Sequence, residues 1–420
     1  MSQKVPEGWK KVALGDVLEL QKGYTYTSEG YSSDPDSLPF AGIKVFHKGG
    51  GFNLSGLKKY TRINDERFIA KSGDIFIANT DLTRNGDIIG SAITIPDDVG
   101  ECIFSMDISK VVVRSHELVR EYAYYLINSP IIRREMRSLS GGSTVIHLKT
   151  KSVPKIVAFL PPLPEQHRIA EILSSVDEAI AATQAVIDQT RTVKQGVMNR
   201  LLTKGIGHTR FKQTEIGEIP EEWDIKSLEH ISIVERGRFS PRPRNDPRYY
   251  GGQIPFVQTG DVVSADTILS THSQTLNEQG LAVSKMFPCG SILITIAANI
   301  GDTAITSYDV CCPDSVVGII PNGNIDVWWL EAFLASKKSY LDSVATKNAQ
   351  KNINLQHLRP LKIPVPPQPD QKHIGLIANY FYDALRVHSA QLASLKRTKS
   401  ALMSDLLTGR KRVSSPGESW

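Results

Sequence analysis

One short sequence occurs twice in this chain, and the repeat constrains the fold more than any other feature. Residues 161–173 read PPLPEQHRIAEIL, and residues 366–378, which lie 205 positions later, read PPQPDQKHIGLIA. Other pairs recur in the same order, such as VPEGW ending at Trp9 and IPEEW ending at Trp223. A period of about 205 to 215 residues is far too long for a solenoid repeat. The sequence therefore predicts a tandem duplication of a whole domain plus a connector.

Each copy changes its character once along its length. Its first 150 or so residues are rich in Gly, Pro, Ser and Asn, with short β-type runs such as DIFIA and SAITI between turn signals. After the proline cluster follows a glycine-poor, helix-forming segment of about 40 residues. The expected fold class is α+β, with two mixed α/β domains and two long helices. The expected parts are a domain at 1–160, a central helix at 161–205, a domain at 206–365, a second helix at 366–412 and a tail at 413–420.

Both helical segments carry apolar residues in an alternation of four and three positions, which is typical of a coiled-coil seam. We expect the two helices to pack antiparallel, with an approximate internal two-fold axis. A lysine interrupts the seam at the same position in both copies. Because a seam that ends near solvent lets lysine extend its ammonium group into water, we expect both lysines to be solvated and unpaired. The predicted seam residues are Ile169, Leu173, Val176, Ile180, Ile187, Lys194, Leu201, Ile374, Phe381, Leu385, Leu392, Lys399 and Leu406.

Composition narrows the class of protein further. No window approaches the roughly 18 consecutive apolar residues of a membrane span, and the N-terminus lacks an apolar run of signal-peptide length, so we expect a cytoplasmic protein. The four cysteines have no metal-ligand spacing and are too few for a disulfide framework, so we expect reduced structural thiols. The net charge of +5 permits a nucleic-acid partner without demonstrating one. Residues 359–412 are the most basic segment, with 10 basic and 3 acidic side chains.

Taken together, these motifs resemble a known family. Two dissimilar domains that open with PEGW or IPEEW, each followed by a PPLPEQ-type junction, a long helix and an LLTG-type ending, are similar to the specificity subunit of type I restriction-modification systems. The resemblance covers residues 5 to about 413. It implies two target recognition domains, each of which reads one half of a bipartite, asymmetric DNA site, with the helices setting the unread spacer.

The resemblance also implies partners that carry the chemistry. Two methyltransferase subunits would dock on the helices, and two restriction or translocase subunits would complete the complex. S-adenosylmethionine, ATP and magnesium are expected on those subunits, and no cofactor, metal or catalytic residue is assigned to this chain. The sequence agrees with this division, because it contains no phosphate-binding GxxxxGK[ST] loop, HExxH or GxSxG motif, and no Asn/Asp-Pro-Pro-aromatic methyltransferase motif.

Three pairs of segments at matching places in the two copies are candidates for DNA contact. Arginine, amide and hydroxyl side chains read base edges, whereas lysines hold phosphates. The first pair is a Tyr-rich segment and an Arg-rich segment, the second is a loop within the sheet, and the third precedes each junction. The candidates from the first copy are Lys22, Tyr24, Tyr26, Thr83, Arg84, Asn85, Lys149 and Lys151. Those from the second copy are Arg236, Arg238, Arg242, Arg244, Arg248, Tyr249, Asn299, Lys347, Lys351, Asn352 and Gln356.

Two other functions remain open at this point. One is a stand-alone DNA-binding protein that reads a split site without a methyltransferase. The other is a coiled-coil scaffold whose end domains bind protein or ligand. A scaffold would not require the same lysine position in both helices while its end domains differ. The duplicated junction and helix therefore favour the specificity subunit.

Overall fold

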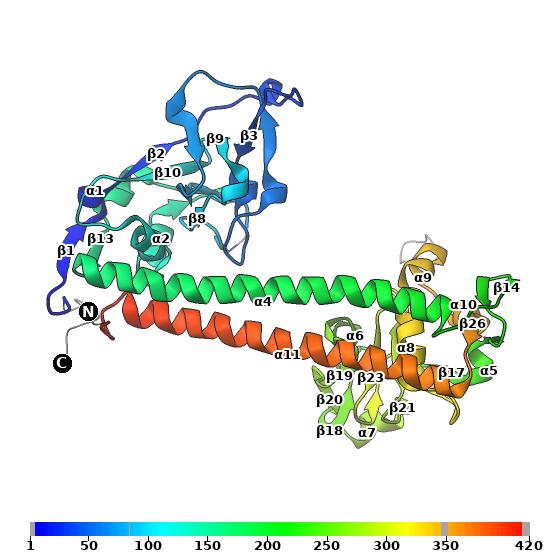
Figure 1. The fold of residues 1–420 in the computed structure, drawn as a ribbon. Coiled ribbons are helices and arrows are strands. Elements are labelled where there is room, and N and C mark those ends of the chain that lie inside the picture. The colour runs from blue at the N-terminus through cyan, green and yellow to red at the C-terminus, as the bar shows by residue number, and fades with distance from the viewer. Residues whose placement is uncertain (1–4, 84, 346–351, 414–420) are drawn as a thin grey trace. The chain divides into compact units, whose positions relative to one another are not determined.

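The computed structural model describes residues 5–83, 85–345 and 352–413. The chain divides into two compact units, shown with their elements in Figure 1. Unit 1 comprises Met1–Ala182 and Ala393–Trp420, and unit 2 comprises Thr183–Leu392. Each unit therefore contains one domain together with part of both long helices. The four cysteines are free thiols, and three of them are buried while Cys289 is exposed.

Unit 1 is built on two four-stranded sheets. The antiparallel sheet has the order β2 (Leu18–Lys22), β10 (Ile108–Val113), β6 (Ile75–Ala78) and β8 (Ala92–Thr94). The other has the order β4 (Lys58–Tyr60), β3 (Leu38–Ala41), β9 (Glu101–Phe104) and β5 (Ile69–Lys71), with β3 and β9 parallel. The flanking elements are β1 (Lys10–Ala13), paired with β13 (Val157–Leu160), and the helices α1 (Leu14–Val17), α2 (Arg120–Asn128) and α3 (Pro130–Ser138).

Unit 2 repeats this plan with additions. One sheet has the order β17 (Ser232–Arg236), β25 (Val316–Pro321), β22 (Ile292–Thr295), β23 (Thr303–Thr306) and β19 (Ile268–Leu269). The other has the order β20 (Gln274–Leu276), β18 (Tyr250–Phe256), β24 (Val310–Cys311) and β21 (Met286–Phe287). Two strand pairs are β14 (Phe211–Thr214) with β15 (Gly217–Pro220), and β16 (Asp224–Ser227) with β26 (Lys362–Val365). The helices are α5 (Leu228–Ile231), α6 (Thr259–Ser264), α7 (Glu278–Ala282), α8 (Val327–Ser336), α9 (Lys338–Val344) and α10 (Leu355–Leu358).

The strand order confirms the duplication predicted from the sequence. The order β2-β10-β6-β8 corresponds to β17-β25-β22-β23, and the parallel pair β3 and β9 corresponds to β18 and β24. In both units the central strands are apolar at successive positions, because a hydrophobic core covers each face of the sheet. In β6, Ile75 and Ile77 enter one hydrophobic core while Phe76 and Ala78 enter another. A sheet with a core on each face explains why DIFIA shows no polar alternation.

The two long helices, α4 (Leu163–Lys204) and α11 (Gln368–Leu406), contribute segments to both units. In unit 1, Ile169 and Leu173 near the start of α4 share a core with Leu406 at the end of α11, so the segments there run antiparallel. In unit 2, Leu202 near the end of α4 shares a core with Ile374 near the start of α11. All of the predicted seam residues are buried or half-buried.

The repeated junction motif has a structural role in each unit. The amide of Gln166 accepts the N–H of Val119 at 2.9 Å and donates to the carbonyl of Pro161 at 2.9 Å. Gln371 in unit 2 does the same, accepting the N–H of Asp326 at 3.0 Å and donating to the carbonyl of Pro366 at 2.9 Å. Each glutamine therefore ties the start of a long helix to the start of a domain helix, α2 or α8. Figure 1 shows α2 beside the early turns of α4.

The acidic residue before each glutamine contacts a basic side chain that follows the end of the other long helix. In unit 1, Glu165 is buried and accepts Arg412 Nε at 2.7 Å, Arg412 Nη2 at 2.9 Å and the indole N–H of Trp9 at 3.2 Å. In unit 2, Asp370 lies 2.8 Å from Nε2 of His208. The side chain of Asp370 is one methylene shorter, and the indole nitrogen of Trp223 is buried without a hydrogen-bond partner among the described residues. The duplication thus keeps the arrangement but not every bond.

The expectation that the seam lysines are unpaired is wrong for Lys399. Its ammonium group lies 2.5 Å from Asp177 of α4, and the Lys399 side chain is only 24% exposed. Lys194 is half-buried in unit 2, and its charge acts on the buried carboxyl of Glu331 on α8. Burial nevertheless raises the pKa of Glu331 to about 7. Lys399 is therefore paired across the two long helices, whereas Lys194 acts on Glu331 through its charge.

Candidate nucleic-acid interface

Unit 1 brings together two of the segments predicted to contact DNA. The sheet loop begins at β7 (Thr80–Asp81), and the segment before the junction forms β11 (Ser140–Gly141) and β12 (Ile146–Leu148). These strands form one sheet in the order β11-β12-β7, with His147 opposite Thr80. Asn85, Lys149 and Lys151 are exposed, and Thr83 is half-buried. Arg84 lies outside the described residues.

Unit 2 joins the corresponding segments by backbone contacts. Ala297 and Asn352 form a β-bridge, and the N–H of Ile353 donates to the carbonyl of Ile296 at 3.0 Å. Asn299 in the loop and Gln356 on α10 are exposed, while Asn352 is half-buried. Lys347 and Lys351 lie outside the described residues. The same two-segment arrangement therefore occurs in both units, with different side chains.

The Tyr-rich segment of unit 1 is largely part of the domain interior. Tyr24 and Tyr26 are half-buried in an aromatic cluster with Tyr31, Phe40 and Tyr60, in which most ring pairs meet edge to face. Burial, followed by the charge of Asp107, raises the pKa of Tyr26. Of the three residues predicted to contact DNA in this segment, Lys22 is exposed and the two tyrosines are half-buried. The two tyrosines stabilise the loop packing, and their role toward DNA stays a prediction.

The Arg-rich segment of unit 2 is exposed, yet its guanidinium groups are held by neighbours. Arg244 pairs with Asp314 at 2.8 Å, and Arg248 pairs with Asp246 at 2.6 Å. The remaining arginines donate to backbone carbonyls: Arg236 to Asp314, Arg238 to Ser284 and Arg242 to Pro241. Tyr249 is half-buried against Phe239. These contacts fix the loop, and an arginine in it that binds DNA must share or exchange its present partner.

Sequence reasoning missed Asp81, which organises the sheet loop of unit 1. This side chain is fully buried and accepts the N–H groups of Thr83, Ile88 and Ile89 at 2.7, 2.7 and 2.9 Å. The signal was present, because an Asp followed two residues later by Thr is typical of a side-chain-stabilised turn. Residue type alone does not distinguish a carboxylate that holds a backbone from one at the surface.

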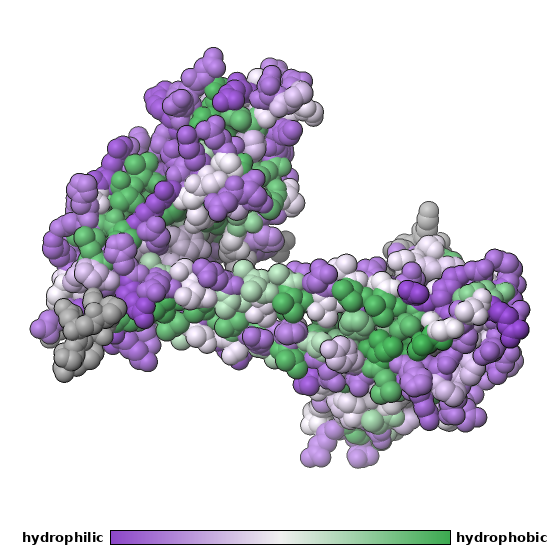
Figure 2. All heavy atoms as spheres, viewed as in Figure 1, coloured by the Kyte–Doolittle hydropathy of each residue, from purple (hydrophilic) through white to green (hydrophobic). Residues whose placement is uncertain are grey.

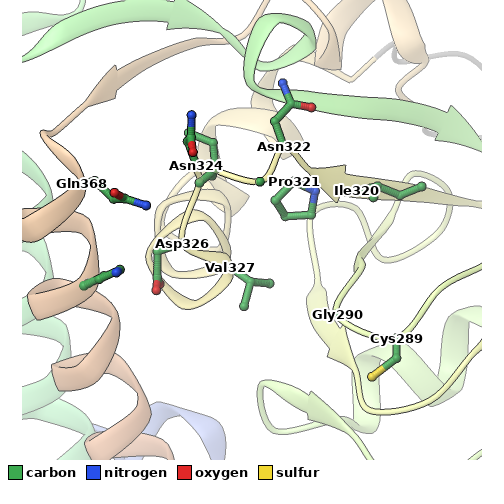
Figure 3. A pocket seen from close by; sticks show the side chains of 12 residues that line it. Cys289, Gly290, Ile320, Pro321, Asn322, Asn324, Asp326, Val327 and Gln368 are labelled. Carbon is green, nitrogen blue, oxygen red and sulfur yellow. The ribbon is translucent and has the colours of Figure 1, made fainter.

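A cavity of about 410 Å³ lies in unit 2 beside the starts of α8 and α11. Figure 3 shows Asp326, Val327 and Gln368 around it, with Cys289 at one side. Asp326 caps α8 by accepting the N–H of Trp329 at 2.9 Å. Asp326 in the wall of the cavity therefore serves the helix cap, and none of the predicted DNA-contacting residues lines the cavity.

Apolar side chains are exposed along both long helices in unit 2. On α11, Leu376, Tyr380 and Val387 are 65%, 71% and 54% exposed, and their spacing of four and seven places them on one helix face. On α4, Val186 and Val193 are 44% and 42% exposed and lie seven residues apart. Figure 2 shows apolar residues gathered over these helix segments. Within the described ranges, no helix combines the length and the apolar character needed to cross a membrane.

Comparison with known families gives a match over most of the chain. A family model described as the type I restriction modification DNA specificity domain matches residues 6–190 and again residues 220–397. A putative type I restriction enzyme specificity subunit, MjaX of Methanocaldococcus jannaschii, is 26% identical and covers 98% of this chain and 95% of its own length. The EcoKI specificity subunit of Escherichia coli is 22% identical over 88% of this chain and 81% of its own length.

Two solved structures share the fold. The crystal structure of a type I restriction-modification S subunit from M. genitalium has a TM-score of 0.62 at 15% identity, over 97% of each chain. A chain from a study of complex assembly and conformational transition of the type I R-M system has a TM-score of 0.55 at 19% identity. That match covers 97% of this chain and all of the other.

Proposed function

Because this chain belongs to the type I restriction-modification DNA specificity family, as a recognition subunit rather than a catalytic one, we propose that each unit reads one half of a bipartite, asymmetric DNA site. The observation that carries the proposal is the paired construction of the two units. In each, a loop of the central sheet lies beside the segment that precedes the junction. Equivalent positions carry different side chains, which suits two different half-sites.

Selection from random double-stranded DNA tests this reading. The chain, purified with its methyltransferase subunits, should enrich sequences that contain two short motifs separated by a fixed number of unspecified base pairs. Exchange of residues 6–160 for those of another family member should change one motif and leave the other. Enrichment of one uninterrupted motif, or of none, would count against the proposal and favour a scaffold.

We further propose that the long helices dock two methyltransferase subunits. The exposed apolar face of α11, at Leu376, Tyr380 and Val387, supports this proposal, because an apolar stripe at helical spacing is suited to a partner helix. Tyr380→Glu should reduce copurification of the methyltransferase. The control is Tyr340→Glu, which places the same charge on a tyrosine that is 53% exposed and belongs to α9 rather than to a long helix. Equal retention of the methyltransferase by both variants would contradict the docking proposal.

In this account two restriction or translocase subunits complete the assembly, and S-adenosylmethionine, ATP and magnesium act on the partner subunits. The chain contributes sequence recognition and spacing. Because α4 begins in unit 1 and ends in unit 2, we propose that the number of helical residues between the units sets the length of the unread spacer.

A further inference from the structure

The sheet loop of unit 1 closes around a buried carboxylate. Asp81 stands at the end of β7, and its three bonds to backbone N–H groups join the start of the loop at Thr83 to its end at Ile88 and Ile89. Hydrogen bonds to an ionised acceptor are stronger than neutral ones, and burial keeps water from competing for them. The carboxylate thus fixes both ends of the loop to one point.

Two further contacts hold the middle of the loop. Thr83 Oγ1 accepts the N–H of Asp87 at 2.8 Å, and Arg133 of α3 donates to the carbonyl of Asp87 at 3.0 Å. Burial is the main cause that lowers the pKa of Arg133 to about 10, and the charge of Asp81 acts in the opposite direction. Asp81 and Arg133 therefore both hold the backbone of the loop.

Part of the loop is exposed, while its anchor is buried. Leu82 is 64% exposed and Asn85 is exposed, whereas Asp81 is 0% exposed. A buried carboxylate cannot touch a DNA base, and its charge would repel phosphate rather than bind it. Its contribution toward DNA is consequently indirect, through the conformation of the loop that carries Leu82 and Asn85.

The corresponding loop of unit 2, which the structure describes in full, contains no counterpart of this anchor. Gly90 donates to the carbonyl of Ala78 at 2.9 Å, and Gly301 donates to Thr295 at 2.9 Å, so these pairs mark equivalent loop ends. The loop between them spans residues 79–89 in unit 1 but only 296–300 in unit 2, where the sequence IAANI contains no carboxylate. The short loop is instead tied to Ile353 through its backbone.

We propose that Asp81 is a positioning residue that presets the loop of unit 1 for sequence reading, so that one half-site alone depends on a buried carboxylate. This inference rests on the proposed function. Asp81→Asn keeps the size of the side chain but replaces one acceptor oxygen by an N–H donor, which faces backbone N–H groups that also donate. At least one anchoring bond is lost, and the two ends of the loop are no longer both held by this side chain.

The test measures DNA binding by the full chain with its methyltransferase subunits. Competitor duplexes carry the selected motif with either the first or the second half-site substituted. For Asp81→Asn we expect the preference for the intact motif over one of these substituted duplexes to fall about ten-fold or more, the effect of losing one bond to a charged acceptor. The preference over the other substituted duplex should stay within about two-fold of the wild-type value, the range of an ordinary surface change.

The matched control is Asp87→Asn, which removes one negative charge from the same loop. Its side chain is not needed for the loop contacts, because these use the backbone N–H and carbonyl of Asp87. Both preferences should be kept. A second variant, Thr83→Val, removes the acceptor for the Asp87 N–H and should weaken the same half-site as Asp81→Asn, also where Asp81→Asn does not fold. Hydrogen exchange at the amides of Ile88 and Ile89 should accelerate in Asp81→Asn.

Unchanged preferences, or equal loss at both half-sites, would overturn the inference. A wild-type complex that distinguishes neither half-site would instead overturn the proposed function, so the two failures are separable.

Discussion

The ammonium group of Lys399 on α11 lies 2.5 Å from a carboxylate oxygen of Asp177 on α4, and the hydroxyl of Tyr125 on α2 donates to the other oxygen at 3.0 Å. One carboxylate therefore joins both long helices to the domain of unit 1. The lysine that interrupts the apolar seam is thus a point of attachment. The charge of its repeat partner Lys194 acts on a different acid, the buried Glu331 on α8, and lowers the pKa of that carboxyl against the larger effect of burial.

A double-mutant cycle measures this attachment. Lys399→Met and Asp177→Asn should each destabilise the chain, and their coupling free energy should be about 1 kcal/mol, because the pair is partly buried and shares a hydrogen bond with tyrosine. Urea unfolding gives the free energies. The pair of Arg191 and Asp188 on α4, with side chains 59% and 61% exposed, is the control and should couple by less than half as much. Equal coupling in both pairs would show that burial adds nothing.

Loss of the Arg412 guanidinium should destabilise unit 1. Arg412→Ala leaves Glu165, whose side chain is 6% exposed, with the indole of Trp9 as its one hydrogen-bond donor among the described residues. A buried carboxylate without a counter-charge costs about 2 kcal/mol or more in the free energy of unfolding. Trp9 fluorescence during denaturation reports the change. Arg410→Ala, at a side chain 63% exposed, is the matched control and should have little effect. A similar loss of stability in both variants would mean that Arg412 acts through its charge in general and not through its bonds to Glu165.

The stability of unit 2 should depend on pH through Glu331. Burial raises the pKa of this carboxyl from 4.5 to about 7, so the folded state binds a proton that the unfolded state has released between these values. Stability from this group is therefore present below pH 4.5 and is lost as pH rises toward 7. Glu331→Gln should be more stable than the wild type at pH 8, and the advantage should shrink as pH falls through this window. A constant difference in the free energy of unfolding between Glu331→Gln and the wild type from pH 4 to 8 would contradict the raised pKa of Glu331.

Insertion of four residues after Ile187 tests the spacing role of the helices. One added turn lengthens α4 by roughly 6 Å, which corresponds to about two base pairs of duplex. The complex should then methylate a site with a longer spacer and unchanged half-sites. Insertion of the same residues in the tail after residue 413 is the control and should leave the spacer as it was. An unchanged spacer length in the variant with the insertion in α4 would contradict the proposal that the helices set the spacer.

The repeat, the mixed domains and the long helices could be predicted because they depend on local patterns. Proline clusters, glycine ends and seam spacing are visible in a single sequence. The partners of Lys399 and Arg412 could not be predicted, since Asp177 and Glu165 lie more than 200 residues away and are brought near only by the packing of α4 against α11. Pattern alone does not say which distant residues meet.

The candidate interface was predicted only in part, for a related reason. Residue type suggested Arg244 and Arg248, but their pairing with Asp314 and Asp246 depends on the tertiary fold and on a local turn. Conversely, Asp81 was missed because its function is to hold a backbone, which residue type does not reveal. The adjacency of the sheet loop and the segment before the junction needed the pairing of β7 with β12.

Methylome mapping by single-molecule sequencing of host DNA, with and without this gene, tests the central claim most directly. The account predicts an adenine-methylated motif made of two short half-sites around a gap, which disappears when the gene is deleted and returns when it is restored. Unchanged methylation on deletion, in cells that express the partner methyltransferase, would contradict the recognition role.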